Sequence, residues 1–227
     1  MRREPIRLII FDCDGVLVDS EPIAMRVLLK TLSDAGVSIM PEDAQPLFLG
    51  KSLAAICAIL GEEFGLDVTA ATLEQMRRDL YEAFRHELKP IAGVARTLQQ
   101  LRTATCVASS SQLERIHLAL NVTGLLQYFE PFIYSATMVA KGKPAPDLFL
   151  HAARQMRAEP RHCLVIEDSP AGIEAGVRAG MRVYAFVGGS HATGSHHRES
   201  IRALGPAQTF ANMRQLPSLL NQEMGKD

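Results

Sequence analysis

The sequence lacks several features that would mark a specialised class of protein. Lys and Arg together number 24 and Asp and Glu 25, so the net charge is −1. This balance gives no indication of a cationic surface for nucleic acid or an anionic membrane. Only four cysteines are present, scattered and without CxxC spacing. We therefore expect neither a disulfide framework nor a zinc site, and free thiols in a reducing compartment.

Long hydrophobic segments are missing as well. The apolar run near the N-terminus ends at Asp12 and is too short for a signal peptide. The longest later run, residues 53–60, is too short to cross a bilayer. We expect a soluble cytoplasmic protein, with a monomer as the default oligomeric state.

Short apolar runs recur along the chain, each followed by a turn and then a helical pattern. They occupy residues 7–11, 105–110, 131–135, 162–168 and 182–187. Apolar runs without strict alternation suit strands that are buried on both faces. Their alternation with helices predicts an α/β fold, a Rossmann-like parallel sheet with helices on both faces.

Residues 18–88 interrupt this rhythm. They contain helical patterns at 22–35, 52–64 and 70–88 but no convincing strand. We predict an inserted all-α domain at 18–88, with residues 1–17 and 89–227 forming the core domain. The alternative is that these helices form an ordinary crossover between strands, for which the segment is long.

Two aspartates, Asp12 and Asp14, follow directly on the first apolar run. In an extended chain they point to the same side, at the sheet edge where open α/β folds bind ligands. Gly15 permits a sharp turn after them. Two carboxylates this close require a cation or a shared proton, and Mg²⁺ suits oxygen ligands. A carboxylate is also a nucleophile for phosphoryl transfer, with its neighbour as general acid and base. The alternative is that both cap the following turn.

Three further strand ends carry polar groups. Ser109 and Ser110, in a run of three serines, precede a helix and can bind an anion, or simply cap that helix. Lys143 lies before a proline and can neutralise a phosphoryl group, or be an ordinary surface lysine. Glu167 and Asp168 end another apolar run, with Asp168 the better direct metal ligand; capping of the next helix is the alternative. Together the four strand ends favour phosphoryl transfer over the simpler explanations.

The chain resembles the haloacid dehalogenase superfamily of phosphatases. The resemblance rests on DxDGVLxDS at 12–20, the serine motif at Ser109, KPxPD at 143–147, and the ED pair at 167–168 followed by SPAGI. It covers the whole chain. It implies a parallel Rossmann-like sheet with a helical cap inserted after the first strand, the smaller-cap arrangement of β-phosphoglucomutase-like members.

The resemblance also implies residue roles. Asp12 is then the nucleophile and a Mg²⁺ ligand, and Asp14 is the acid and base, with its backbone carbonyl on the metal. Asp168 completes the metal site, assisted by Glu167. The implied phosphoryl-binding groups are the side chains of Ser109 and Lys143 and the backbone N–H groups of Cys13, Asp14 and Ser110.

Departures from related subgroups narrow the reaction. The dehalogenases of the superfamily lack the second aspartate of the motif. This chain has it, as Asp14, which favours phosphoryl transfer. Leu53 and Ala24 stand where β-phosphoglucomutase carries an arginine and a histidine, which argues against the mutase reaction. The pattern is more similar to sugar-phosphate phosphatases of the 6-phosphogluconate phosphatase type. Glu21 and Lys51 are candidate substrate contacts, with a first-turn helix acid and a solvated lysine as the alternatives.

The leading hypothesis is a Mg²⁺-dependent phosphatase of a small phosphorylated metabolite, a sugar phosphate or phosphosugar acid, without nucleic acid or membrane partners. The alternatives are a β-phosphoglucomutase-type mutase and a non-catalytic phosphometabolite-binding protein. The Gly/Ser/His-rich segment 188–198 is expected to be a surface loop. Its histidines, His191, His196 and His197, are expected to be in solvent because no acid or cysteine joins them at ligand spacing.

Overall fold

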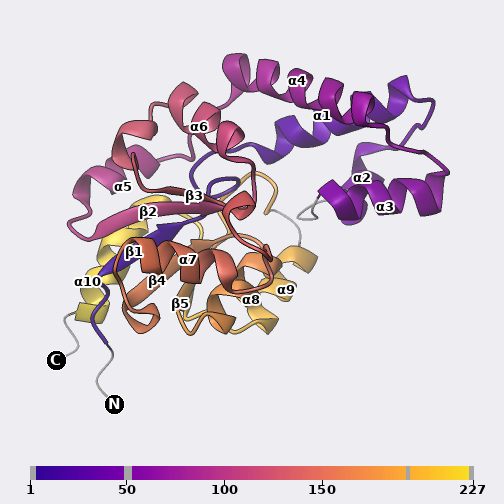
Figure 1. The fold of residues 1–227 in the computed structure, drawn as a ribbon. Coiled ribbons are helices and arrows are strands. Elements are labelled where there is room, and N and C mark those ends of the chain that lie inside the picture. The colour runs from indigo at the N-terminus through magenta and orange to yellow at the C-terminus, as the bar shows by residue number, and fades with distance from the viewer. Residues whose placement is uncertain (1–3, 49–52, 193–194, 225–227) are drawn as a thin grey trace. The chain divides into compact units, whose positions relative to one another are not determined.

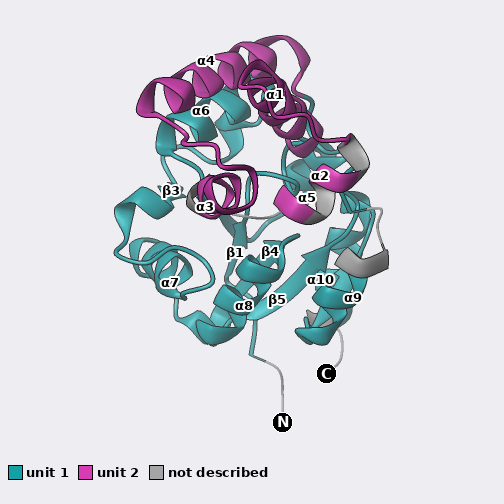
Figure 2. Cartoon of the chain, turned by 90° about the vertical axis from the view of Figure 1, so that its right-hand side faces the viewer, with its two compact units in different colours: residues 1–19, 89–227 teal, residues 20–88 magenta. Residues whose placement is uncertain are grey.

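The computed structural model describes residues 4–48, 53–192 and 195–224. The chain forms two compact units, one of residues 1–19 with 89–227 and one of residues 20–88 (Figure 2). The first unit contains a parallel sheet and the second is helical. In the described part of the chain no helix is long and apolar enough to cross a membrane.

The sheet has six parallel strands among the described residues, in the order β3-β2-β1-β4-β5-β6. Their bounds are β1 (Leu8–Phe11), β2 (Ala104–Ser109), β3 (Ile133–Ser135), β4 (Cys163–Glu167), β5 (Arg182–Phe186) and β6 (Gln208–Phe210). All four residues of β1 are at most 1% exposed, as an apolar run without alternation predicts for a strand covered on both faces. The predicted α/β fold is confirmed, and β6 is an addition that the apolar pattern did not indicate.

Helices cover both faces of the sheet. In the first unit they are α5 (Val94–Gln100), α6 (Leu113–Val122), α7 (Asp147–Gln155), α8 (Pro170–Arg178), α9 (Ser195–Ala203) and α10 (Leu216–Met224), with short 3₁₀ turns η1 (Leu126–Tyr128), η2 (Ala136–Met138), η3 (Pro160–His162) and η4 (Met213–Gln215). Helices α7 and α8 pack on one face, and α5 and α10 lie on the other (Figure 1). Apolar side chains from strands and helices meet between these layers.

The second unit is built of α1 (Glu21–Asp34), α2 (Pro41–Phe48), α3 (Leu53–Phe64) and α4 (Ala70–Glu87). Helices α1 and α4 pack against each other, and the unit has its own small core around Leu32 and Phe48. The predicted helical insertion after the first strand is therefore confirmed. Helix α2 was not predicted, because its sequence PEDAQPLF contains two prolines and no long apolar stripe.

Two segments join the units, and they pair with each other. The Val18 backbone bridges to Pro90, and the Asp19 N–H donates to the Lys89 carbonyl at 3.0 Å. The predicted boundary at residues 17 and 18 stays an expectation, as does the idea that the helical unit works as a cap.

Candidate active site

The register of the sheet places three chemical groups in one row. Phe11 of β1 pairs with Val107 of β2 and with Ile166 of β4, so the next residues on these strands are Asp12, Ala108 and Glu167. Parallel strands in register present equivalent positions at the same level, at the carboxyl edge of the sheet. The row therefore contains a carboxylate, a backbone carbonyl and a second carboxylate.

Lys143 joins this row. Its Nζ lies 2.6 Å from Asp12 Oδ1, 2.7 Å from Glu167 Oε1 and 3.1 Å from the Ala108 carbonyl oxygen. The lysine side chain is only 4% exposed, and its Nζ also lies 4.9 Å from the centre of the Phe149 ring. The alternative of a surface lysine is therefore wrong, and Lys143 is a buried counter-charge for two acids.

Burial and mutual repulsion determine the protonation behaviour of these groups. Burial raises the pKa of Asp12 well above its usual range; Lys143 lowers it, and Glu167, Asp168 and Asp14 raise it further. For Lys143, burial lowers the pKa, but Asp12 and Glu167 raise it above its usual value. The lysine is thus held protonated, and the site carries an excess of negative charge that favours a cation.

Glu167 is largely committed to neighbouring donors. Its Oε2 accepts hydrogen bonds from the backbone N–H groups of Asp168 and Ser169 and from Ser169 Oγ, at 2.8–2.9 Å. Its Oε1 binds Lys143. Ser169 caps α8, where its Oγ accepts from the Gly172 N–H. The cap of α8 is therefore Ser169, so Glu167 and Asp168 have other roles.

Gly172 makes room for the Glu167 carboxylate. A Cβ atom on this buried helical glycine would overlap the carboxylate group, which its four donors hold in place. We expect Gly172→Ala to lower the free energy of unfolding by about 1–3 kcal/mol, as overpacking does, and to reduce activity. Urea unfolding of the variant measures the first effect.

Gly61→Ala is the control for this substitution. Gly61 is also helical, in α3, but a Cβ atom on it would have nothing within 4 Å apart from its chain neighbours and the backbone of its own helix. There the change from glycine to alanine should stabilise by up to about 1 kcal/mol through helix propensity alone. Equal changes in unfolding free energy at both positions would show that the Glu167 carboxylate can move aside to accommodate the extra methyl group.

Asp14 is bound by a different pair of groups, both from the serine segment and the helix after it. Ser111 Oγ donates to Asp14 Oδ2 at 2.7 Å, and Arg115 NH2 lies 2.8 Å from Asp14 Oδ1. The Ser111 carbonyl in turn accepts from Ser135 Oγ at 2.7 Å. Arg115 was not a candidate from the sequence, and Ser111 was considered only as part of the run of three serines, without a contact to Asp14. The available signal was that both lie where the serine segment leads into the next helix: Ser111 is two residues before Leu113, the first residue of α6, and Arg115 is in its first turn.

The serine segment does not cap that helix. Helix α6 begins at Leu113, and Gln112 occupies the N-cap position without a side-chain cap bond. Ser109 is 1% exposed, and its Oγ accepts from the Ser111 N–H at 3.2 Å. Ser110 is exposed and lies between these two. Simple N-capping by a serine is therefore excluded.

Asp168 is paired with a histidine that the sequence had placed in solvent. His191 Nε2 lies 2.8 Å from Asp168 Oδ2, with side-chain exposures of 5% and 8%. The expectation of a solvated loop is wrong here, because His191, in the turn after β5, contacts the acid that directly follows β4. The other two histidines, His196 and His197, have side chains outside the described residues, although α9 begins within the predicted loop.

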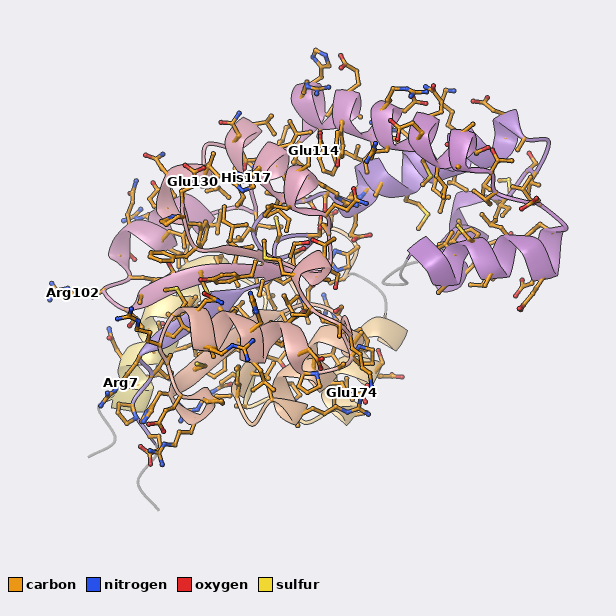
Figure 3. The ribbon with its side chains drawn as sticks, viewed as in Figure 1. Arg7, Arg102, Glu114, His117, Glu130 and Glu174 are labelled. Carbon is orange, nitrogen blue, oxygen red and sulfur yellow. The ribbon has the colours of Figure 1, made fainter. Side chains whose placement is uncertain are left out.

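Charged groups elsewhere in the first unit contrast with these buried acids. Arg7, Arg102 and Glu130 are exposed and point outward (Figure 3).

Cys13, between the two aspartates, is buried at 1% exposure, and burial raises the pKa of its thiol well above the usual value. A buried neutral thiol is not a nucleophile, so the reactive groups at this edge are carboxylates.

The donor chemistry of the site fits a hard divalent cation. Asp12 and Asp168 are buried carboxylates, and each uses one oxygen for a nitrogen partner, Lys143 Nζ or His191 Nε2. Burial raises the pKa of Asp168 to about 6, although His191 lowers it. Oxygen donors with excess negative charge suit Mg²⁺. Among the described residues no three His, Cys, Asp or Glu side chains form a metal-ligand cluster, so Mg²⁺ binding stays a prediction.

The two cap candidates belong to the second unit. Glu21 is the first residue of α1 and is half-buried. Lys51 lies outside the described residues. Both stay predictions as substrate contacts.

Comparison with known proteins identifies the family. The model of the haloacid dehalogenase-like hydrolases matches residues 9–186. The chain is 30% identical over 215 residues to the 6-phosphogluconate phosphatase of Escherichia coli, covering 94% of each chain. Among solved structures, a haloacid dehalogenase-like protein of unknown function from Agrobacterium tumefaciens superposes with a TM-score of 0.85 at 37% identity, covering 96% of this chain and 99% of that one.

A further solved structure contains ligands. It is a hydrolase of the same family from Deinococcus radiodurans with bound phosphate and sodium, which superposes with a TM-score of 0.78 at 31% identity over 97% of both chains. The matched range includes the acids that follow β1, the acids at the end of β4, and Lys143. The chain belongs to the haloacid dehalogenase-like hydrolases and is a phosphatase-type enzyme of that family.

Proposed function

We propose that the enzyme is a Mg²⁺-dependent phosphatase that hydrolyses a small phosphorylated metabolite, a sugar phosphate or phosphosugar acid, through an aspartyl-phosphate on Asp12. The observation that carries the proposal is the buried contact of Lys143 with both Asp12 and Glu167. A lysine held charged at the strand edge neutralises a phosphoryl group next to the attacking carboxylate.

In the first step an Asp12 carboxylate oxygen attacks phosphorus, and the bond from phosphorus to the leaving oxygen breaks. Asp14 donates a proton to that oxygen, and the dephosphorylated product leaves. In the second step water attacks phosphorus while Asp14 takes a proton from it. The bond to Asp12 breaks, and inorganic phosphate is released.

Other residues hold the phosphoryl group and the cation. Ser109 and Lys143 bind phosphoryl oxygens, with backbone N–H groups of Cys13, Asp14 and Ser110. Asp12 and Asp168 would hold Mg²⁺ with the backbone carbonyl of Asp14, assisted by Glu167. A Mg²⁺ ion bound there would supply positive charge to the phosphoryl oxygens.

Residues 18–88 act in this proposal as the cap domain that selects the substrate, and residues 1–17 and 89–227 act as the core domain. Similarity to the 6-phosphogluconate phosphatase favours a phosphosugar acid. Lys51 would then meet a second anionic group and Glu21 a hydroxyl. The enzyme is expected to be a cytoplasmic monomer without nucleic acid or membrane partners.

The β-phosphoglucomutase reaction is the second candidate. That reaction retains and reorients a bisphosphate, and Leu53 and Ala24 stand where the mutase has an arginine and a histidine. A non-catalytic binding protein is the third candidate. It would not need Asp12, Asp14, Lys143 and Asp168 to be all present.

The test is phosphate release with Mg²⁺ and with EDTA over a panel of phosphosugars, phosphosugar acids and nucleotides. We expect turnover on phosphosugars or their acids that falls at least about 100-fold when EDTA removes the metal. ³¹P NMR of the same reactions detects isomerisation. Conversion of β-glucose 1-phosphate without net release would favour the mutase. Mg²⁺ binding without turnover on any compound would favour the binding protein.

A further inference from the structure

The turn after β5, residues 188–192, has no role in the steps above. It follows the strand end at Phe186, and the Ala192 N–H donates to the Gly189 carbonyl at 3.0 Å. Ala192 is 0% exposed and His191 is 8% exposed. Because two of its side chains are buried, this short turn is packed against the rest of the first unit and has a defined position.

His191 uses that position to bind Asp168. Its Nε2 contacts Asp168 Oδ2 at 2.8 Å, and both side chains are at most 8% exposed. The two residues are 23 positions apart and come from the ends of neighbouring strands, β4 and β5. The contact engages Oδ2 and so determines how the Asp168 carboxylate is turned.

Two glycines allow the imidazole to lie there. A Cβ on Gly15, whose φ is +76°, would overlap the Asp168 carboxylate and come within 2.8 Å of the His191 ring. A Cβ on Gly189 would come within 2.7 Å of the same ring and 3.0 Å of the Gly15 carbonyl oxygen. The ring is therefore packed between two backbones that approach it without side chains. Such packing restricts the rotamers of His191 and, through it, those of Asp168.

The neighbouring residue fixes the turn from its other side. Ser190 donates from its N–H and Oγ to Asp19 Oδ1, at 3.2 and 2.7 Å. Asp19 in turn donates its N–H to the Lys89 carbonyl, where the two connecting segments pair. The turn is thus held at Asp168 by His191 and at the connecting segments by Ser190.

We propose that His191 is a positioning residue for Asp168: it holds one carboxylate oxygen so that the other is presented to Mg²⁺, and thereby raises the affinity of the site for the metal. The inference rests on the proposed role of Asp168 as a metal ligand. Hydrogen-bonding partners of metal-ligating side chains orient the ligand, and losing one costs about 10–100-fold in metal affinity. Asp168 is already ordered in the folded protein, so Mg²⁺ binding does not have to overcome the entropy loss of ordering its side chain.

The test is isothermal titration of the full-length protein with Mg²⁺ in the absence of substrate. We expect His191→Ala to raise the Kd for Mg²⁺ about 10–100-fold. His191→Gln, whose amide donates from a position similar to that of Nε2, should restore most of the affinity. His162→Ala is the matched control. His162 is equally buried, at 8%, but its Nδ1 lies 2.9 Å from the Pro5 carbonyl oxygen at the opposite end of β4, and its loss should leave the Kd unchanged.

A kinetic measurement on the same variants separates positioning from damage to the chemical step. The Mg²⁺ concentration for half-maximal phosphate release should rise in parallel with the Kd, and the rate at saturating Mg²⁺ should approach that of the wild type. Circular dichroism follows folding. Should His191→Ala fail to fold, His191→Leu replaces it, because leucine fills the space and donates no hydrogen bond.

Several results would overturn the assignment. The first two are a Kd for Mg²⁺ that is unchanged in His191→Ala, and a Kd that is lower, which would mean that His191 competes with the metal for Asp168. The other two are a His191→Gln variant that binds Mg²⁺ no better than His191→Ala, and a wild type that does not bind Mg²⁺. Failure of the proposed function can be distinguished from failure of the positioning role. If Mg²⁺ affinity responds as expected but no phosphorylated compound is turned over, the positioning role stands and the phosphatase proposal does not.

Discussion

Replacing Asp12 by asparagine is expected to reduce phosphate release at least about 10³-fold, as removal of a nucleophile does. Asparagine has nearly the same size and shape but cannot form the aspartyl-phosphate. The measurement is phosphate release at saturating Mg²⁺ with the best substrate of the panel. Acid quenching and mass spectrometry of a peptide containing residue 12 would detect a phosphorylated intermediate in the wild type and none in the variant.

The same substitution should not cost stability. Burial raises the pKa of Asp12, with Glu167, Asp168 and Asp14 adding to the rise, although Lys143 lowers it. An acid whose pKa is higher in the folded state than in the unfolded state is less stable in its charged form. At neutral pH the neutral asparagine therefore removes a cost, and the free energy of unfolding in EDTA should be unchanged or higher.

Asp67→Asn, at an exposed acid in the helical unit, is the control for this experiment and should change neither quantity. Loss of activity together with loss of stability in Asp12→Asn would indicate a structural role for the carboxylate. Retained activity would exclude Asp12 as the nucleophile.

Replacing Lys143 by methionine should impair both activity and stability. The lysine side chain is 4% exposed and contacts two acids, of which Glu167 is 1% exposed and Asp12 9% by side chain. Removing one partner of a buried ion pair leaves uncompensated charge and costs about 3–5 kcal/mol. Urea unfolding at slightly alkaline pH measures this loss. Phosphate release should fall at least about 10³-fold as well, because the phosphoryl group loses its counter-charge.

The pH dependence of the stability loss provides a second check. Without Lys143, the factor that lowers the pKa of Asp12 is gone, so the pKa of the buried acid rises further. Protonation then relieves the unpaired charge as the pH falls, and the difference in unfolding free energy between variant and wild type should narrow toward acidic pH.

Lys141→Met is the matched control. It makes the same chemical change two residues away at an exposed side chain, where loss of a charge has little effect. A Lys143→Met variant as stable as Lys141→Met at alkaline pH would contradict the buried counter-charge.

Much of the site was predictable because its residues follow recognisable strands. Apolar runs that end in Asp12, Ser109 and Glu167 mark buried parallel strands, and parallel strands deliver their last residues to one edge. The family motifs added Lys143, whose own local pattern was that of a surface lysine. These predictions depend on short-range sequence, namely continuous apolar runs and the polar residues that follow them.

Other parts of the site depend on contacts between segments far apart in the sequence. His191 lies in a Gly/Ser/His-rich stretch whose local composition favours a solvated turn, yet it is buried against Asp168. Ser111 and Arg115 reach Asp14 from 97 and 101 residues away. No local pattern identifies such a pair, because its energy arises only once both segments are packed.

The sequence by itself determined the class of fold, the helical insertion after the first strand, and the candidate acids and serines at the strand ends, and its resemblance to a known family added Lys143. Continuous apolar runs for the buried strands and helical periodicity for the insertion carry that information, since both are patterns within a single segment. Only the tertiary structure decided which charges pair: Lys143 with both Asp12 and Glu167, Asp14 with Arg115, and Asp168 with His191. This pairing depends on the register of β1 with β2 and β4. It also depends on Gly15, Gly172 and Gly189, because a side chain at these positions would occupy the space of Asp168, Glu167 or His191.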